Sequence, residues 1–210
     1  MRTDGVAAQP SLRERNKLEK LRRIKKATRE LFVSKGFDDT TIREIAKRAD
    51  VGMGTVFLYA DNKRDLLFLI ANDELEAITD KAIEAFRPDT AVLINLMRAF
   101  RSHYEFFGEQ PELSRFKLRE MMFYDSGKQA KRFQATRERL VGLLTSIIKA
   151  GQERGRIKRT EDAALIGWVA FCIYQVEMHN WLTSDTPALR PGLKRLERAL
   201  NLFLQGASAA

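Results

Sequence analysis

Three features of this sequence predict an all-α fold. Apolar residues recur at steps of three and four along almost every segment, as they do on one face of a helix. Strict alternation of apolar and polar residues, the pattern of a half-buried strand, is scarce. Residues that cap helices precede several of the apolar runs. We expect about nine helices and no sheet, with a three-helix module at the N-terminus joined to a larger helical domain.

The first expected helix begins after Ser11 and ends before Gly36. Ser11 and Glu14 have the spacing of a capping box, and glycine is the residue type that most often ends a helix. Within residues 13–29 nine side chains are basic and two are acidic, and residues 1–66 carry six of the nine net positive charges. This pattern is typical of a surface that approaches nucleic-acid phosphates, although a solvated helix face has it too.

Two short helices are expected next. Thr41 and Glu44 repeat the capping-box spacing at the start of one, and Met53 to Tyr59 form the other. In the turn between them, Gly52 would let the backbone reverse without a side-chain clash. The inward positions of the first short helix are small or aliphatic, which permits close packing: Ile42, Ile45, Ala46 and Ala49.

Turn residues divide the rest of the chain into longer helices. Asn62 and Asp65 are placed to cap a helix that runs to about Phe86, before Pro88. Gly, Pro, Asp and Ser clusters separate the segments that follow. Further helices are expected near residues 90–108, 112–125, 128–152, 161–183 and 191–205, and tails at 1–10 and 206–210.

The stretch TTIREIAKRADVGMGTVFLYADNK, residues 40–63, has the pattern of a helix-turn-helix. In such a motif the second short helix enters the major groove of DNA while the first crosses the backbone. The stretch resembles the signature of the TetR (tetracycline-repressor) family. The residues that carry the resemblance keep the family's order and spacing: Leu31-Phe32, Gly36-Phe37, Thr40-Thr41, Ile45-Ala46, Ala49, Val51, Gly54-Thr55, Phe57, Tyr59 and Lys63.

The resemblance implies an operator of double-stranded DNA and a set of contacts to it. Hydroxyl groups of threonine and tyrosine would donate to phosphates, Lys63 would add a cation at a helix N-terminus, and Arg43 would read a guanine edge. Thr41 would serve as a helix cap, as a phosphate donor or as both. The expected DNA-binding residues are Thr41, Arg43, Gly52, Met53, Gly54, Thr55, Val56, Phe57, Tyr59 and Lys63.

Two positions depart from the family pattern. Phe57 stands where a phosphate-binding tyrosine is usual, and Ala60 where an aromatic residue is usual. We also expect the reading helix to expose Met53, Val56 and Leu58 in place of polar base readers. Specificity would then depend on thymine methyl contacts, on Arg43 and on DNA shape.

The larger domain is expected to form a homodimer, as the family does. The last helix places Leu193, Leu196, Leu200 and Phe203 on one stripe, and the helix before it is apolar almost all round. Two such helices from each protomer would make an intermolecular four-helix bundle. An intramolecular core is the alternative use of the stripe.

Aromatic and sulfur-containing residues are concentrated in the middle of this domain. They suit an apolar cavity for a small molecule, although most would serve equally well as core. The expected ligand-binding residues are Tyr104, Phe107, Met121, Phe123, Trp168, Phe171, Tyr174 and Gln175.

Other classes of protein find little support in the sequence. No catalytic motif, metal-ligand spacing or cofactor-binding loop occurs, so we expect no enzyme, metal or cofactor. One cysteine fits a reducing compartment. There is no apolar run long enough for a membrane span and no signal peptide, so we expect a cytoplasmic protein without a membrane partner.

Together these features predict a ligand-responsive, homodimeric repressor that binds a palindromic operator and is released by a small apolar or amphipathic effector. The alternatives are an all-helical small-ligand-binding protein and a nonspecific nucleoid-type DNA binder. We expect a flexible tail at residues 1–12, a DNA-binding domain at 13–65 with its motif at about 41–60, and a regulatory and dimerisation domain at 66–210.

Overall fold

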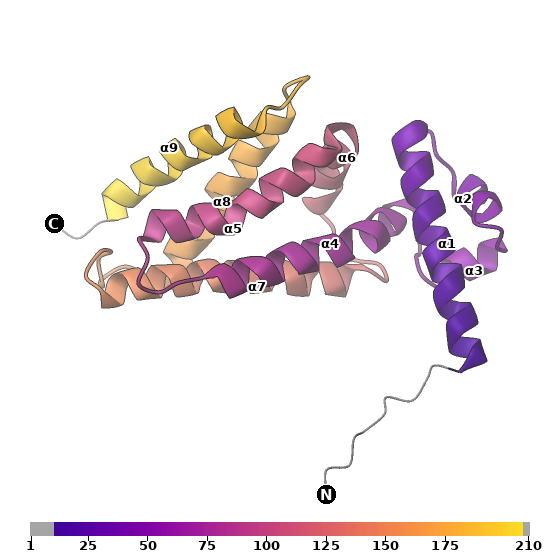
Figure 1. Ribbon diagram of the computed structural model, residues 1–210, viewed down its shortest axis with the longest axis horizontal. Helices are drawn as coiled ribbons and strands as arrows, with labels where there is room; N and C mark the ends of the chain where they lie inside the picture. Colours follow the sequence, from indigo (N-terminus) through magenta and orange to yellow (C-terminus); the bar gives the residue numbers. More distant parts are fainter. Residues whose placement is uncertain (1–10, 208–210) are drawn as a thin grey trace, which may run out of the picture. The chain divides into compact units, whose positions relative to one another are not determined.

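The computed structural model describes residues 11–207 of the chain. Within this range the chain forms nine α-helices and no β-strand, which confirms the all-α prediction (Figure 1). Of the two expected tails, residues 1–10 and 208–210 lie outside the described residues, whereas Gly206 and Ala207, expected in the second tail, belong to the last helix. The described chain divides into two compact units, the first ending at Ile70 and the second beginning at Ala71.

The first unit consists of α1 (Leu12–Ser34), α2 (Ile42–Arg48), α3 (Met53–Phe57) and the beginning of α4 (Lys63–Ala85). The capping box between Ser11 and Glu14 starts α1, as predicted. After α1, Gly36 adopts a left-handed conformation with φ 90°, which glycine tolerates and which ends the helix. The side chains that α1 and α2 bury against one another include Ile24, Phe32, Ile45 and Ala46.

The second unit contains α5 (Val92–Glu109), α6 (Pro111–Met121), α7 (Ala130–Glu153), α8 (Ala163–Leu182) and α9 (Leu189–Ala207), with α4 from Ala71 onward. Helices α7 and α8 pack closely because Gly167 has no side chain. A Cβ atom at that position would lie 2.9 Å from the backbone nitrogen of Thr145. Figure 1 shows α7 and α4 running side by side, and Arg132 and Arg139 of α7 pair with carboxylates of α4.

Trp181 of α8 holds α5 and α9 together. Its indole nitrogen donates a hydrogen bond to the carbonyl of Ala188 at 2.9 Å. Added Cβ atoms would lie 2.9 Å from the ring at Gly108 and 2.6 Å from it at Gly192. Both glycines are therefore needed for the ring to fit between the helices.

The helix boundaries follow the predicted turns, with one clear difference. Residues up to 125 were expected to continue the sixth helix, which instead ends at Met121. Leaving the helix lets Tyr124 become buried against Phe133, at a centroid distance of 5.8 Å, while Phe123 is 78% exposed. Within residues 11–207, no helix combines the length and the apolar character needed to cross a membrane.

Candidate nucleic-acid interface and ligand cavity

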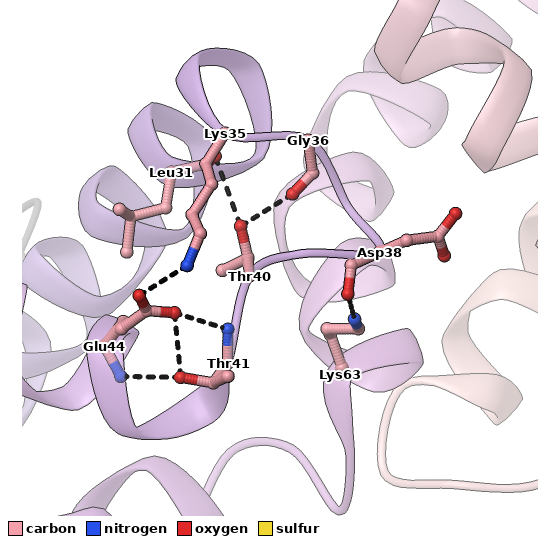
Figure 2. Close-up of polar contacts among 8 residues, drawn as sticks. All are labelled: Leu31, Lys35, Gly36, Asp38, Thr40, Thr41, Glu44 and Lys63. Carbon is pink, nitrogen blue, oxygen red and sulfur yellow. Dashed lines mark hydrogen bonds and ion pairs between the residues drawn. The ribbon is translucent and has the colours of Figure 1, made fainter.

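A charged clamp fixes the start of α2 (Figure 2). The backbone nitrogen of Glu44 donates to the Thr41 hydroxyl at 3.2 Å, and Glu44 accepts hydrogen bonds of 2.8 Å from both the backbone nitrogen and the hydroxyl of Thr41. Lys35 pairs with the same carboxylate at 2.6 Å. The lysine first, and then the two Thr41 donors, lower the pKa of Glu44 to about 2.

The hydrogen bonds of this clamp define the role of the Thr41 hydroxyl. A hydroxyl has one hydrogen, and Thr41 donates its hydrogen to Glu44. Thr41 is thus the N-cap of α2, as one of the two predicted roles required. Its role as a phosphate donor stays a prediction, and it would require the hydroxyl to leave Glu44.

The loop before α2 is held by groups on both sides of it. The buried hydroxyl of Thr40 donates to the carbonyl of Gly36 at 2.6 Å. From the start of α4, the amine of Lys63 donates to the carbonyl of Asp38 at 2.7 Å (Figure 2). The same amine lies 4.8 Å from the centre of the Phe37 ring. Lys63 therefore has a structural role in this loop, in addition to any contact it makes with DNA.

The turn between α2 and α3 is made by a residue other than the predicted one. Gly52 has an ordinary extended conformation, φ −68°, as the N-cap of α3. The left-handed residue is Asp50, with φ 51°, and its carboxylate pairs with Arg23 of α1 at 2.8 Å. Aspartate tolerates this conformation better than most residues, so the expected role of Gly52 belongs to Asp50.

Helix α3 presents one side to solvent and is fixed by the other. Met53, Phe57 and Leu58 are 42%, 39% and 70% exposed, as a reading surface requires. Gly54 is also exposed, and an added Cβ there would meet nothing within 4 Å. Val56 is fully buried, so its prediction as an exposed DNA-binding residue was wrong. Every third or fourth residue of so short a helix must face the core, and Val56 is that residue.

The other predicted DNA-binding residues differ in exposure and in whether their side chains already have a hydrogen-bond partner within the protein. Arg43 is exposed and forms no ion pair with any residue that the structure describes. Thr55 is half-buried. The Tyr59 hydroxyl donates to the carbonyl of Lys17 in α1 at 3.2 Å. Lys47, four residues after Arg43 on the same exposed face, was not among the predicted residues, although its helical spacing from Arg43 points to it.

The second unit contains an apolar cavity of about 310 Å³ that is open to solvent on one side, where the lining residues Met122 and Val176 are exposed. Six of the eight predicted ligand-binding residues line it: Phe107, Met121, Trp168, Phe171, Tyr174 and Gln175. The other two lie elsewhere, Tyr104 fully buried with its ring centroid 4.8 Å from that of Trp181 and Phe123 exposed beyond the end of α6. The cavity also has lining residues that were not predicted, among them Leu75, Thr79, His103 and Arg137.

Contacts between aromatic rings pack one wall of the cavity. Tyr174 stacks on Phe100 with a centroid distance of 4.4 Å, and Trp168 lies 5.5 Å from Phe171. Burial raises the pKa of Tyr174, so its hydroxyl stays neutral. His103 is buried too, and burial lowers its pKa to about 4. These polar groups are therefore uncharged at neutral pH.

The stripe predicted for dimerisation is used inside the chain. Leu196 and Leu200 are fully buried and Leu193 is 7% exposed, because α9 packs on α5 and α8 of its own protomer. Phe203 is half-buried. The intramolecular alternative is therefore correct for the three leucines, and the large apolar side chains left exposed on α8 and α9 are Leu165, Trp168, Val176 and Leu202.

Residues 24–70 match the family described as bacterial regulatory proteins, tetR family. Over longer stretches the chain is similar to curated regulators. The HTH-type transcriptional repressor KstR of Mycobacterium tuberculosis is 26% identical over 213 residues, covering 98% of this chain and 90% of that protein. The fatty acid metabolism regulator protein of Bacillus subtilis is 22% identical over 174 residues, covering 81% and 88%.

Solved structures share the fold along most of the chain. Thermus thermophilus FadR, a TetR-family transcriptional repressor in complex with lauroyl-CoA, is 27% identical with a TM-score of 0.69, covering 89% of this chain and 94% of that one. Bacillus subtilis FadR in complex with stearoyl-CoA is 19% identical with a TM-score of 0.68, covering 88% and 98%. At 19% identity the second likeness concerns the fold alone.

Proposed function

We propose that the chain is a TetR-family regulator, a homodimeric repressor released from a palindromic operator by an amphipathic effector; the match of residues 24–70 to that family supports this. The observation that carries this proposal is the pairing of two features in one chain. One is a short helix, α3, exposed on one side and fixed by Val56 on the other. The other is the apolar cavity of the second unit.

We assign the DNA contacts in two groups. Arg43 and Lys47 of α2 are exposed cations without a carboxylate partner among the described residues, and Met53, Gly54 and Phe57 form the exposed side of α3. The second group would exchange an existing hydrogen bond for one to DNA: Thr41, Tyr59 and Lys63. The Tyr59 bond joins two neutral groups and has a net value of about 1 kcal/mol, so a charge-assisted bond to phosphate can replace it. The Thr41 bond to the Glu44 carboxylate and the Lys63 bond from its ammonium group are themselves charge-assisted, so each would be exchanged for a bond of similar strength. Gly52 and Thr55 complete the set.

The effector is proposed to contain an apolar chain of medium length. Most of the cavity lining is aliphatic or aromatic, and its volume is at the lower end of the range of about 300–1,000 Å³ found for small-molecule sites. The Thermus thermophilus repressor, which is 27% identical to this chain, was solved in complex with lauroyl-CoA. An acyl chain of medium length therefore suits both the lining and the volume of this cavity.

Release would follow from a shift between two arrangements of the dimer. In the arrangement that binds DNA, the two α3 helices would be spaced by about one turn of DNA, 34–36 Å. The effector must bind the other arrangement more tightly, and a full reversal of the equilibrium needs a preference of about 10⁴-fold. We propose the cytoplasm as the place of action, and no catalytic role.

The test is selection of a binding site from random duplexes, followed by measurement of affinity at two salt concentrations. We expect a palindrome whose affinity falls steeply with salt. The double variant Arg43→Ala and Lys47→Ala should bind it at least about tenfold more weakly, since one arginine contact to guanine contributes about 1–3 kcal/mol. Dodecanoyl-CoA should release the wild-type protein from the site.

The matched control is Arg98→Ala with Lys194→Ala, which removes two exposed positive charges from the second unit. It should bind the palindrome as the wild type does. Equal affinity for random and selected DNA would overturn the proposal in favour of a nonspecific nucleoid-type binder. Ligand binding without any DNA binding at low salt would favour an all-helical small-ligand-binding protein.

A further inference from the structure

The lining of the cavity is apolar except at a few positions, and one of these positions holds a permanently charged side chain. Among the described residues that line the cavity, Arg137 of α7 is the one permanent cation, and none is acidic. The other polar groups are neutral side chains: Thr79, His103, Thr136, Tyr174 and Gln175. A cation at the wall of an apolar cavity is costly unless something compensates its charge.

The neighbouring arginines of α7 are compensated within the chain. Arg132 pairs with Asp73 at 2.7 Å and also with Glu76, and Arg139 pairs with Asp80. All three carboxylates come from α4. Arg137 lies between these two arginines in sequence but forms no ion pair or hydrogen bond with any residue in the described part of the chain. Its position on α7 instead directs it to the cavity.

Two aromatic rings hold Arg137 in place. Its guanidinium carbon lies 5.5 Å from the centre of the Trp168 ring and 5.5 Å from that of Phe171, within the range of cation–π contacts. Both rings line the cavity themselves. Such contacts orient the guanidinium without using its N–H groups, so its five donors stay available for a planar anion.

We propose that Arg137 binds the anionic head group of the effector, whose apolar chain fills the rest of the cavity. This inference rests on the proposed function and adds a chemical requirement to it: the ligand is an amphipathic anion. The head group is a carboxylate or a phosphate, both of which match the donors of a guanidinium. A free carboxylic acid with an apolar chain would supply the first and an acyl-CoA the second.

The experiment compares three probes that share one apolar chain. Dodecanoate carries a carboxylate, dodecanoyl-CoA carries phosphates, and 1-dodecanol carries no charge. Their affinities for the full-length protein are measured by calorimetry for the wild type, Arg137→Gln, Arg137→Lys and Arg139→Gln. The last variant is the matched control, because Arg139 is on the same helix, pairs with Asp80 and does not line the cavity.

We expect the wild type to bind at least one anionic probe about tenfold or more tighter than 1-dodecanol, as a charge-assisted hydrogen bond implies. Arg137→Gln should abolish that preference and leave the affinity for 1-dodecanol unchanged. Arg137→Lys should retain part of the preference, and Arg139→Gln all of it. Whichever anion loses affinity identifies the source of the head group.

An unchanged preference for the anions in Arg137→Gln would overturn the inference, and so would a changed dimer dissociation constant with the preference intact. Release from the operator distinguishes this failure from failure of the proposed function. If Arg137→Gln is released by the same effector concentration as the wild type, the repressor function stands and the role of Arg137 is wrong. If the anions bind through Arg137 but never release DNA, the role of Arg137 stands and the proposed repressor function is wrong.

Discussion

His103 illustrates how burial decides the chemistry of one side chain. Its ring is 3% exposed and lies beside Tyr174, and its Nδ1 is 3.0 Å from the carbonyl of Ala99, to which it donates when protonated there. Removal from water disfavours the charged ring and lowers its pKa from 6.5 to about 4, while the hydrogen bond to Ala99 acts in the opposite direction. The neutral ring thus belongs to the wall of the cavity.

The free energy of unfolding should therefore depend on pH through His103. Between pH 6.5 and about 4 the unfolded chain binds a proton at this residue that the folded chain does not. The contribution of neutral His103 to the free energy of unfolding is fully present above pH 6.5 and is lost as the pH falls towards 4. The total loss has a limit of about 3 kcal/mol. Urea unfolding at pH 7.5, 6 and 5 measures it. In His103→Leu the pH dependence should be shallower, and identical profiles for the two proteins would contradict the assignment.

Single residues also show where sequence reasoning reaches its limit. The caps at Ser11, Thr41 and Asn62 were predictable because each partner lies three residues away. The left-handed residue at the α2–α3 turn was not, since Asp50 and Gly52 both occur in such turns and the choice depends on the path of the backbone. Val56 was misplaced because a five-residue helix is too short for a periodic pattern to show which side is buried.

At the scale of helices, two glycines in α7 and α8 have opposite roles. Gly142 lies in α7, and an added Cβ there would meet nothing within 4 Å. Gly167 lies in α8, where an added Cβ would be 2.9 Å from the nitrogen and 3.1 Å from the Cα of Thr145 in α7. The first is an unconstrained position inside a helix, and the second is the point of closest approach between two helices.

Alanine at these positions should therefore change stability in opposite directions. Gly142→Ala should raise the free energy of unfolding by about 0.5–1 kcal/mol, because alanine loses less backbone entropy in a helix. Gly167→Ala should lower it by about 1–3 kcal/mol, because the backbone of α7 must move away. Chemical denaturation monitored by circular dichroism gives both values from paired experiments. A stabilised Gly167→Ala protein would show that α7 and α8 are not packed as described.

An amphipathic stripe predicts that a face is buried, but it does not identify what covers that face. Leu193, Leu196 and Leu200 were expected to contact a second protomer and are covered by α5 and α8 of the same chain. The same limit applies to the cavity, where aromatic residues were predicted and His103 and Arg137 were not. Their contribution depends on how α5 and α7 are turned, which is set by contacts between residues far apart in the sequence.

For the whole molecule, the proposed dimer requires a face of α9 other than the predicted stripe, together with exposed apolar residues of α8. Leu165 and Val176 of α8 are each 58% exposed, and Leu202 of α9 is 61% exposed. Apolar side chains with this exposure on two helices that pack together are suitable for an isologous interface. The interface would then join the outward faces of these helices and leave the buried stripe of α9 in the core of each protomer.

Leu202→Arg should weaken the dimer, because a charge would have to be buried at its interface. We expect the dimer dissociation constant to rise at least about tenfold in sedimentation experiments, with a parallel loss of operator affinity. Ile83→Arg is the control, since Ile83 is a 39% exposed aliphatic residue on α4. A Leu202→Arg protein that dimerised as strongly as the wild type would exclude this face.

The two tryptophans of the chain, Trp168 and Trp181, both lie on α8 in the second unit. Trp168 lines the cavity and is 41% exposed, whereas Trp181 is 7% exposed between α5 and α9. A collisional quencher of fluorescence such as acrylamide should therefore reach the first indole and not the second. The quenchable fraction of the emission then reports occupancy of the cavity, while the protected fraction reports the integrity of the fold, so the unmodified protein contains its own optical sensor.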